Sequence, residues 1–131
     1  MNINELAKEI HENAVAHGWY DKAPSLPEQI ANFHSELSEA LEEYRNGKPP
    51  IYGTCVFARK DCEHEDECDV VKWGIGSNAY CKPQGIAFEL SDCVIRILDT
   101  LHFMGVDVEG VIMAKHEYNK HREYRHGGKV I

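Results

Sequence analysis

The fold is decided by residues 85–99, which read Gly-Ile-Ala-Phe-Glu-Leu-Ser-Asp-Cys-Val-Ile-Arg-Ile-Leu-Asp. Apolar residues recur there every three or four positions, which is the spacing of one face of a helix. That face, extended to the end of the segment, consists of Ile86, Leu90, Cys93, Val94, Ile97, Leu98 and Leu101. The pattern predicts a helix that starts near Pro83, ends at Gly105 and buries this broad face.

Three further segments have helical spacing: residues 3–16, residues 26–44 and residues 108–124. Ser25 and Glu28 have the spacing of a capping box, and Asp107 is a suitable N-cap for the last helix. The apolar stripe of the second helix consists of Ile30, Phe33, Leu37, Ala40, Leu41 and Tyr44. Four helices in 131 residues predict an all-α fold, a four-helix bundle that forms one domain over residues 1–131.

The composition excludes several classes of protein. The formal charge of −8 repels nucleic-acid phosphates, so we expect no nucleic-acid partner. No apolar run is long enough to span a bilayer, and no basic start or apolar h-region marks a secretory signal, so we expect no membrane association. An odd number of cysteines without such a signal favours reduced thiols and a cytoplasmic protein.

Residues 48–82 form an insertion between the second and third helices that follows no clear period. It contains Cys55, Cys62, Cys68 and Cys81. These thiols are possible ligands of a structural Zn²⁺ ion, although their spacing is not the paired C-x2-C type. Reduced thiols in a hairpin and a disulfide formed on isolation are the alternatives. A structureless loop of this length is uncommon in a compact domain, so we expect an insertion with its own cross-link, a small hairpin or a mobile lid.

Acidic residues border the apolar stripes of two helices. Glu36 and Glu39 lie three residues apart on the second helix, and Glu89 and Asp92 repeat this spacing on the third. If the two helices pack antiparallel, the carboxylates converge and repel one another unless a cation neutralises them. Oxygen ligands without His or Cys suit Mg²⁺ or Mn²⁺. The alternative is that they are solvated and form local ion pairs, such as Asp92 with Arg96.

The fourth helix carries polar residues where its pattern expects apolar ones. The stripe that begins at Val108, Val111 and Ile112 continues as Lys115, Asn119 and Arg122. Cations at core positions are costly when buried without a partner, so we expect them to face the carboxylates or an anionic ligand. The alternative is that these side chains extend past the end of the bundle into water.

These residues together resemble the MazG-like, all-α nucleoside triphosphate pyrophosphohydrolases. The family pattern is ExxE on one helix and ExxD on the next, here Glu36-Leu37-Ser38-Glu39 and Glu89-Leu90-Ser91-Asp92. Residues 85–99, 115–122 and 126–129 are similar to the family's later helices and tail, and His17-Gly18-Trp19 to the segment after its first helix. The resemblance covers roughly residues 3–47 and 83–131; the Cys-rich insertion lies outside it.

The resemblance implies hydrolysis of a nucleoside triphosphate between its α and β phosphates, with a role in clearing the nucleotide pool. It implies that Glu36, Glu39, Glu89 and Asp92 bind Mg²⁺ or Mn²⁺, with Glu43 or Asp99 as possible extra ligands. Glu39 is the candidate to orient the attacking water. Lys115, Asn119 and Arg122 would hold the phosphates, and Trp19 would stack on the base or else pack in the core.

Two other substrates, phosphoribosyl-ATP and dUTP, fit the same resemblance. A third hypothesis is a non-catalytic helical interaction module with solvated carboxylates. The family also implies an oligomer, and apolar faces left by a short bundle favour at least a homodimer, with a homotetramer as the alternative.

Overall fold

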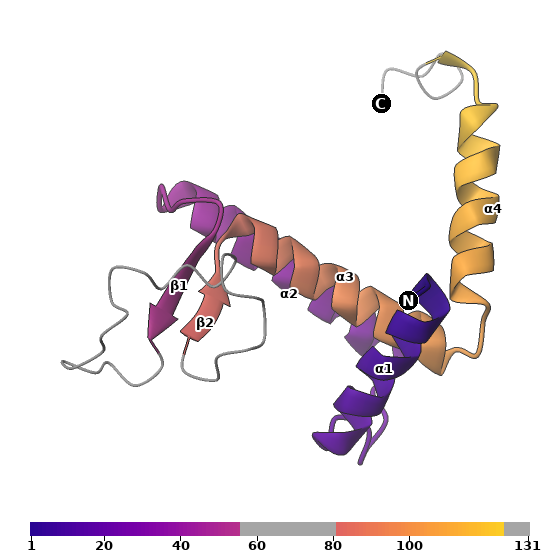
Figure 1. Cartoon of the computed structure of the whole chain (residues 1–131), viewed down its shortest axis with the longest axis horizontal. Helices are drawn as coiled ribbons and strands as arrows, with labels where there is room; N and C mark the ends of the chain where they lie inside the picture. Colours follow the sequence, from indigo (N-terminus) through magenta and orange to yellow (C-terminus); the bar gives the residue numbers. More distant parts are fainter. Residues whose placement is uncertain (56–80, 125–131) are drawn as a thin grey trace. The chain divides into compact units, whose positions relative to one another are not determined.

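The computed structural model describes residues 1–55 and 81–124. These residues are mostly helical, and the helices are α1 (Ile3–Ala16), α2 (Leu26–Arg45), α3 (Ile86–Phe103) and α4 (Val108–Lys120). Two short strands, β1 (Tyr52–Cys55) and β2 (Cys81–Gln84), form an antiparallel ribbon that leads into α3 (Figure 1). The predicted helical character is therefore confirmed for most of the described residues, and the ribbon adds a small β element.

Capping side chains explain the helix starts. The Asn2 side chain accepts from the Glu5 backbone N–H at 2.9 Å, and Glu5 bonds the Asn2 N–H in return. Ser25 and Glu28 form the predicted capping box at the start of α2. Asp107 caps α4 by accepting from the Gly110 N–H at 3.0 Å. Each cap satisfies backbone donors that a helix leaves unpaired in its first turn.

Two helix boundaries differ from the prediction. The third helix begins at Ile86 rather than near Pro83, because Pro83 pairs with Gly53 in the ribbon. The fourth helix ends at Lys120 rather than at residue 124. Proline fits a first helical turn and an edge strand equally well, so the sequence around Pro83 did not distinguish them.

The described chain divides into two compact units. Unit 1 comprises Met1–Pro24 and Ile97–Ile131, and unit 2 comprises Ser25–Arg96, so α3 contributes to both. The core of unit 1 is formed by Ala7, Leu98 and Val108, with Ile3, Ile10 and Leu101 packed against it. Beside this core, Asp99 accepts a hydrogen bond from the Tyr20 hydroxyl at 2.8 Å and lies 2.7 Å from His11 Nδ1.

In unit 2, α2 contacts the first part of α3. The Cys93 thiol is buried and donates to the Phe33 carbonyl at 3.7 Å, which confirms Cys93 as a small core residue. Phe33 of α2 is bonded by Cys93 of α3, and Glu39, which lies further along α2, meets Glu89, which lies earlier on α3. The two helices therefore run antiparallel. This is the arrangement that the two acidic pairs require.

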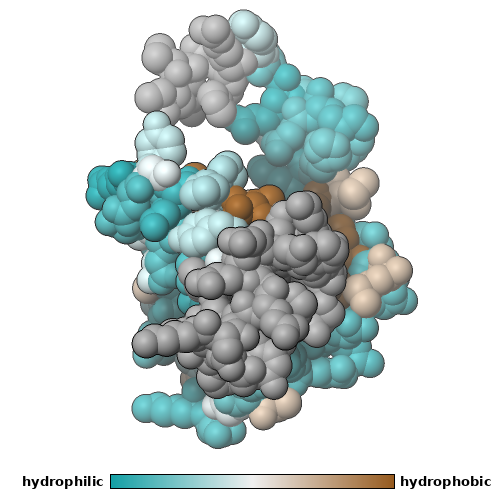
Figure 2. Space-filling view, turned by 60° about the vertical axis from the view of Figure 1, so that its left-hand side comes forward, coloured by the Kyte–Doolittle hydropathy of each residue, from teal (hydrophilic) through white to brown (hydrophobic). Residues whose placement is uncertain are grey.

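The apolar stripes are less buried than the sequence predicted. Ala40 and Cys93 are buried, but the side chains of Ile30, Leu37, Leu41, Tyr44, Leu90 and Val94 are exposed. Brown, apolar atoms lie open among teal ones on the face drawn in Figure 2. The predicted buried face of the third helix is therefore only partly buried in the single chain, since Leu90 and Val94 are exposed, and open apolar faces of the kind expected for a short bundle are present on α2 and α3. No helix in residues 1–55 and 81–124 is long and apolar enough to cross a membrane.

Candidate metal centre

Three carboxylates meet between α2 and α3. One oxygen each from Glu36, Glu89 and Asp92 can be chosen so that all lie within 4.8 Å of one another. Glu36 is only 5% exposed, Glu89 is half-buried, and Asp92 is the most exposed of the three, although its carboxyl is partly withdrawn from water. The antiparallel packing of the two helices thus brings three of the four predicted metal ligands to one place.

The fourth predicted ligand, Glu39, is next to Glu89. Burial raises the pKa of the Glu89 carboxyl above its ordinary value, and the charge of Glu39 and a hydrogen bond with it raise the pKa further. The charges of Asp92 and Glu36 act in the same direction. These four residues are called the acid cluster below. Its members repel one another, so a proton or another cation is favoured among them.

Two basic side chains of unit 2 act on this cluster. Arg96 Nε forms a short ion pair with Glu36 Oε1 across the helix pair. Burial has the largest effect on the Asp92 carboxyl and raises its pKa. The positive charge of Arg96, and to a lesser extent that of Lys82 on β2, lowers the pKa of Asp92, whereas the charge of Glu39 raises it. The chain's own cations therefore offset part of the negative charge of the acid cluster.

The ribbon adds a tyrosine at the edge of this region. The Tyr52 hydroxyl donates toward both carboxylate oxygens of Glu43, at 2.7 and 3.0 Å. The hydrogen bond to Glu43 raises the pKa of Tyr52 above its ordinary value, and burial and the charges of Glu43 and Glu89 add to this rise. Glu43, considered above as an extra ligand, is thus held by a residue of the strand that opens the insertion.

The donor set fits a hard divalent cation. All members of the acid cluster offer carboxylate oxygens, which Mg²⁺ and Mn²⁺ prefer, and the exposed side at Asp92 leaves room for waters or substrate oxygens. Among the described residues, its members Glu36, Glu89 and Asp92 are the one group of three or more His, Cys, Asp and Glu side chains close enough to hold an ion. Asp99 is instead engaged by His11 and Tyr20 in unit 1.

The predicted phosphate-binding residues belong to unit 1. Lys115 and Asn119 lie on α4 and Arg122 follows it, and all are exposed. Lys115 Nζ lies 5.0 Å from the centroid of the Tyr118 ring. Because these side chains are open to water in the described chain, the cost of burying them does not arise there. Their place opposite the acid cluster stays a prediction.

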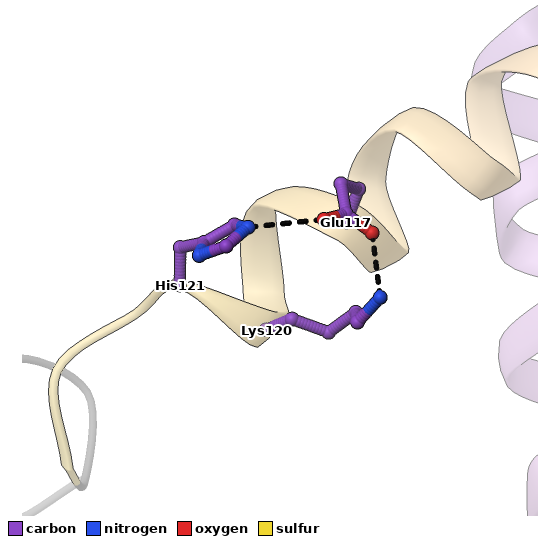
Figure 3. A network of polar contacts seen from close by, with 3 residues as sticks. All are labelled: Glu117, Lys120 and His121. Carbon is purple, nitrogen blue, oxygen red and sulfur yellow. Dashed lines mark hydrogen bonds and ion pairs between the residues drawn. The ribbon is translucent and has the colours of Figure 1, made fainter.

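Near the end of α4, a separate polar network surrounds Glu117 (Figure 3). Lys120 Nζ lies 2.7 Å and His121 Nε2 3.0 Å from its carboxylate oxygens. The hydrogen bond from Lys120 and then that from His121 lower the pKa of Glu117. This network follows helical spacing and uses none of the predicted phosphate-binding side chains.

The other predicted residues are placed as follows. Trp19 is 56% exposed, so it is not a core aromatic in the described chain. Cys55 and Cys81 are directly opposite each other in the β1–β2 register, whereas Cys62 and Cys68 lie outside the described residues. The zinc hypothesis and its alternatives, reduced thiols in a hairpin and a disulfide, therefore stay predictions, because only two of the four cysteine positions lie among the described residues.

Sequence reasoning missed two pairings, Arg96 with Glu36 and Tyr52 with Glu43. On its own helix, Arg96 has the spacing to pair with Asp92, and Tyr52 lies in the aperiodic insertion. Helical spacing therefore indicates neither pairing. A tyrosine or an arginine that can face a line of carboxylates is a signal of such a pairing, but recognising it requires knowing how two elements pack together.

No protein family, curated protein or solved structure was found to match this chain.

Proposed function

We propose that this chain is a metal-dependent nucleoside triphosphate pyrophosphohydrolase that releases a nucleoside monophosphate and pyrophosphate. The observation that supports the proposal is the meeting of Glu36, Glu89 and Asp92 between two antiparallel helices, with Glu39 beside them. The ordered ExxE and ExxD motifs, which resemble those of MazG-like enzymes, connect this acid cluster to that reaction. The same resemblance implies a four-helix bundle and a homo-oligomer.

In the proposed mechanism, Glu36, Glu89 and Asp92 would hold a magnesium or manganese ion. When bound, this ion supplies positive charge to the phosphate oxygens, on which negative charge accumulates as the bond to pyrophosphate breaks. Glu39 would orient a water for attack on the α-phosphorus and accept its proton, the role of a carboxylate general base within hydrogen-bond reach of the water. Lys115, Asn119 and Arg122 bind the remaining phosphate oxygens.

The test is a panel of ribo- and deoxyribonucleoside triphosphates with Mg²⁺, with dUTP and phosphoribosyl-ATP included and products identified. We expect Glu39→Gln and Asp92→Asn each to lower kcat/KM on the order of 10²-fold or more. Glu42→Gln is the matched control, because Glu42 is an exposed carboxylate of the same helix, 3.9 Å from Arg45. Pyrophosphate release that persists in Glu39→Gln and Asp92→Asn contradicts the assignment.

A second candidate, a non-catalytic helical interaction module, is favoured by the exposed apolar side chains of α2 and α3. The two candidates differ in their response to nucleotide. An enzyme of the proposed kind is stabilised against heat by a non-hydrolysable deoxynucleotide analogue only when Mg²⁺ is present. An interaction module shows no such shift, so a thermal melt with and without Mg²⁺ separates the two.

A further inference from the structure

Glu36 is the most buried member of the acid cluster. Its side chain is 7% exposed, and its partner Arg96 is 30% exposed. A buried carboxylate is tolerated when a cation or hydrogen-bond donors replace the water that it has lost. Arg96 reaches it from α3, so the pair also joins the two helices that supply the cluster.

Arg96 is near a second member of the cluster as well. It lies one helical turn beyond Asp92 on α3, and its charge lowers the pKa of that carboxyl against the opposing effect of burial. A guanidinium keeps its charge at every pH that a protein tolerates. A fixed positive charge thus occupies the edge of the volume in which the proposed divalent cation would bind.

We propose that Arg96 is the counter-ion of the metal-free acid cluster and that a divalent cation binds against its charge. This inference rests on the proposed function, since it concerns the same site. Two cations among the same carboxylates repel each other, so Arg96 stabilises the metal-free fold and weakens metal binding. The arginine thereby favours loading of the metal together with an anion, such as a nucleotide phosphate, that adds negative charge.

The first experiment measures Mn²⁺ affinity of the full chain by electron paramagnetic resonance without nucleotide. We expect Arg96→Gln to bind Mn²⁺ about 10-fold more tightly than the wild type, since one repelling charge is gone. Arg96→Lys keeps the charge and stays within about threefold of the wild type. Arg45→Gln is the matched control, because it removes an equal charge from a side chain that is 66% exposed on α2, and its affinity is unchanged.

The outcomes separate this inference from the proposed function. Unchanged or weaker Mn²⁺ binding by Arg96→Gln, with a wild type that binds, overturns the counter-ion role and leaves the metal site intact. Loss of binding in the wild type and in every variant contradicts the metal site itself, and both proposals fall with it. Binding by Arg96→Gln alone supports the counter-ion role in its strongest form.

A second measurement covers the case in which Arg96→Gln is too unstable for the binding experiment. Melting temperatures are compared in EDTA for Arg96→Gln and for the double variant Arg96→Gln with Glu36→Gln. A counter-ion role predicts a lower melting temperature for the single variant and its recovery in the double variant, because the stranded buried charge is removed. No recovery, or a double variant that is also unfolded, means that Arg96 acts through packing, and it overturns the proposal.

Discussion

Glu89 is the residue at which like charge is most concentrated. Its pKa is raised by burial, by Glu39 and by the other members of the acid cluster. The folded state therefore holds this proton more tightly than the unfolded state does. As pH rises from the ordinary pKa of a glutamate to the raised value, the metal-free fold loses stability, and the loss persists at higher pH.

We expect Glu89→Gln to raise the stability of the metal-free protein near neutral pH by about 0.5–1 kcal/mol, the size of a partly screened repulsion. Below the ordinary pKa, where Glu89 is protonated in both states, the gain disappears. Urea unfolding in EDTA at several pH values measures both effects. If Glu89→Gln is less stable than the wild type at neutral pH, the charge of Glu89 does not destabilise the metal-free fold.

The residues of the acid cluster could be predicted because they lie on regular helices. Three residues span nearly one turn, so the spacing of Glu36 with Glu39, and of Glu89 with Asp92, already places each pair on one face. The partners of these residues could not be predicted in the same way. Which carboxylate Arg96 reaches depends on the offset between α2 and α3, and no single-helix pattern contains that offset.

Among the secondary-structure elements, the β1–β2 ribbon is held tightly to the start of α3. The Ala87 N–H donates to the Pro50 carbonyl at 3.1 Å. Gly85, with φ +108°, lies so close that an added Cβ would overlap that same carbonyl oxygen. Gly47 also has a positive φ, +64°, but nothing lies within 4 Å of the Cβ position there. An alanine at Gly47 would meet only the left-handed penalty, whereas an alanine at Gly85 would meet both this overlap and a φ outside the left-handed region that L residues adopt.

Alanine at these positions gives a matched comparison. Gly47→Ala should cost about 1 kcal/mol, which is the penalty of a left-handed conformation alone. Gly85→Ala should cost about 3 kcal/mol or more, because the overlap with Pro50 adds to a φ of +108°, which L residues rarely adopt. Chemical denaturation of both variants measures the difference. Equal costs would mean that the ribbon shifts freely away from α3.

Helix positions followed well from the sequence, since caps and periodicity are local signals. The range of α1 agrees with the predicted 3–16, and α2 ends at Arg45, one residue beyond the predicted 26–44. The ribbon is only one of several options that the sequence leaves open, because its pairing joins residues near the two ends of the insertion. Local propensity at Pro83 carries no information about the partner Gly53.

At the scale of the whole molecule, the exposed apolar side chains of α2 bear on assembly. Ile30, Leu37 and Leu41 are 44, 47 and 50% exposed, and they recur at helical spacing. Such a face is suited to pairing with the same face of a second copy. The sequence predicted the apolar stripe but not which part of it one chain can cover, since coverage depends on how many helices reach that face.

We expect light scattering to give a dimer or a larger assembly at micromolar concentration. Leu41→Glu should weaken the assembly at least about 10-fold, because it places a charge at an apolar contact. Asn32→Glu adds the same charge two and a half turns away, on the opposite side of α2, and should leave the mass unchanged. A monomeric wild type would contradict the prediction.

The ladder between β1 and β2 also has a consequence for changes in chain length. Its last pair, Cys55 with Cys81, brings the two ends of the intervening chain to adjacent positions. When both ends of a segment are fixed close together, the entropy of closing it grows only slowly, by about 0.6 kcal/mol for each doubling of its length. We therefore expect the paired positions Cys55 and Cys81, rather than the number of residues between them, to set the spacing of the segments that lead to α2 and α3.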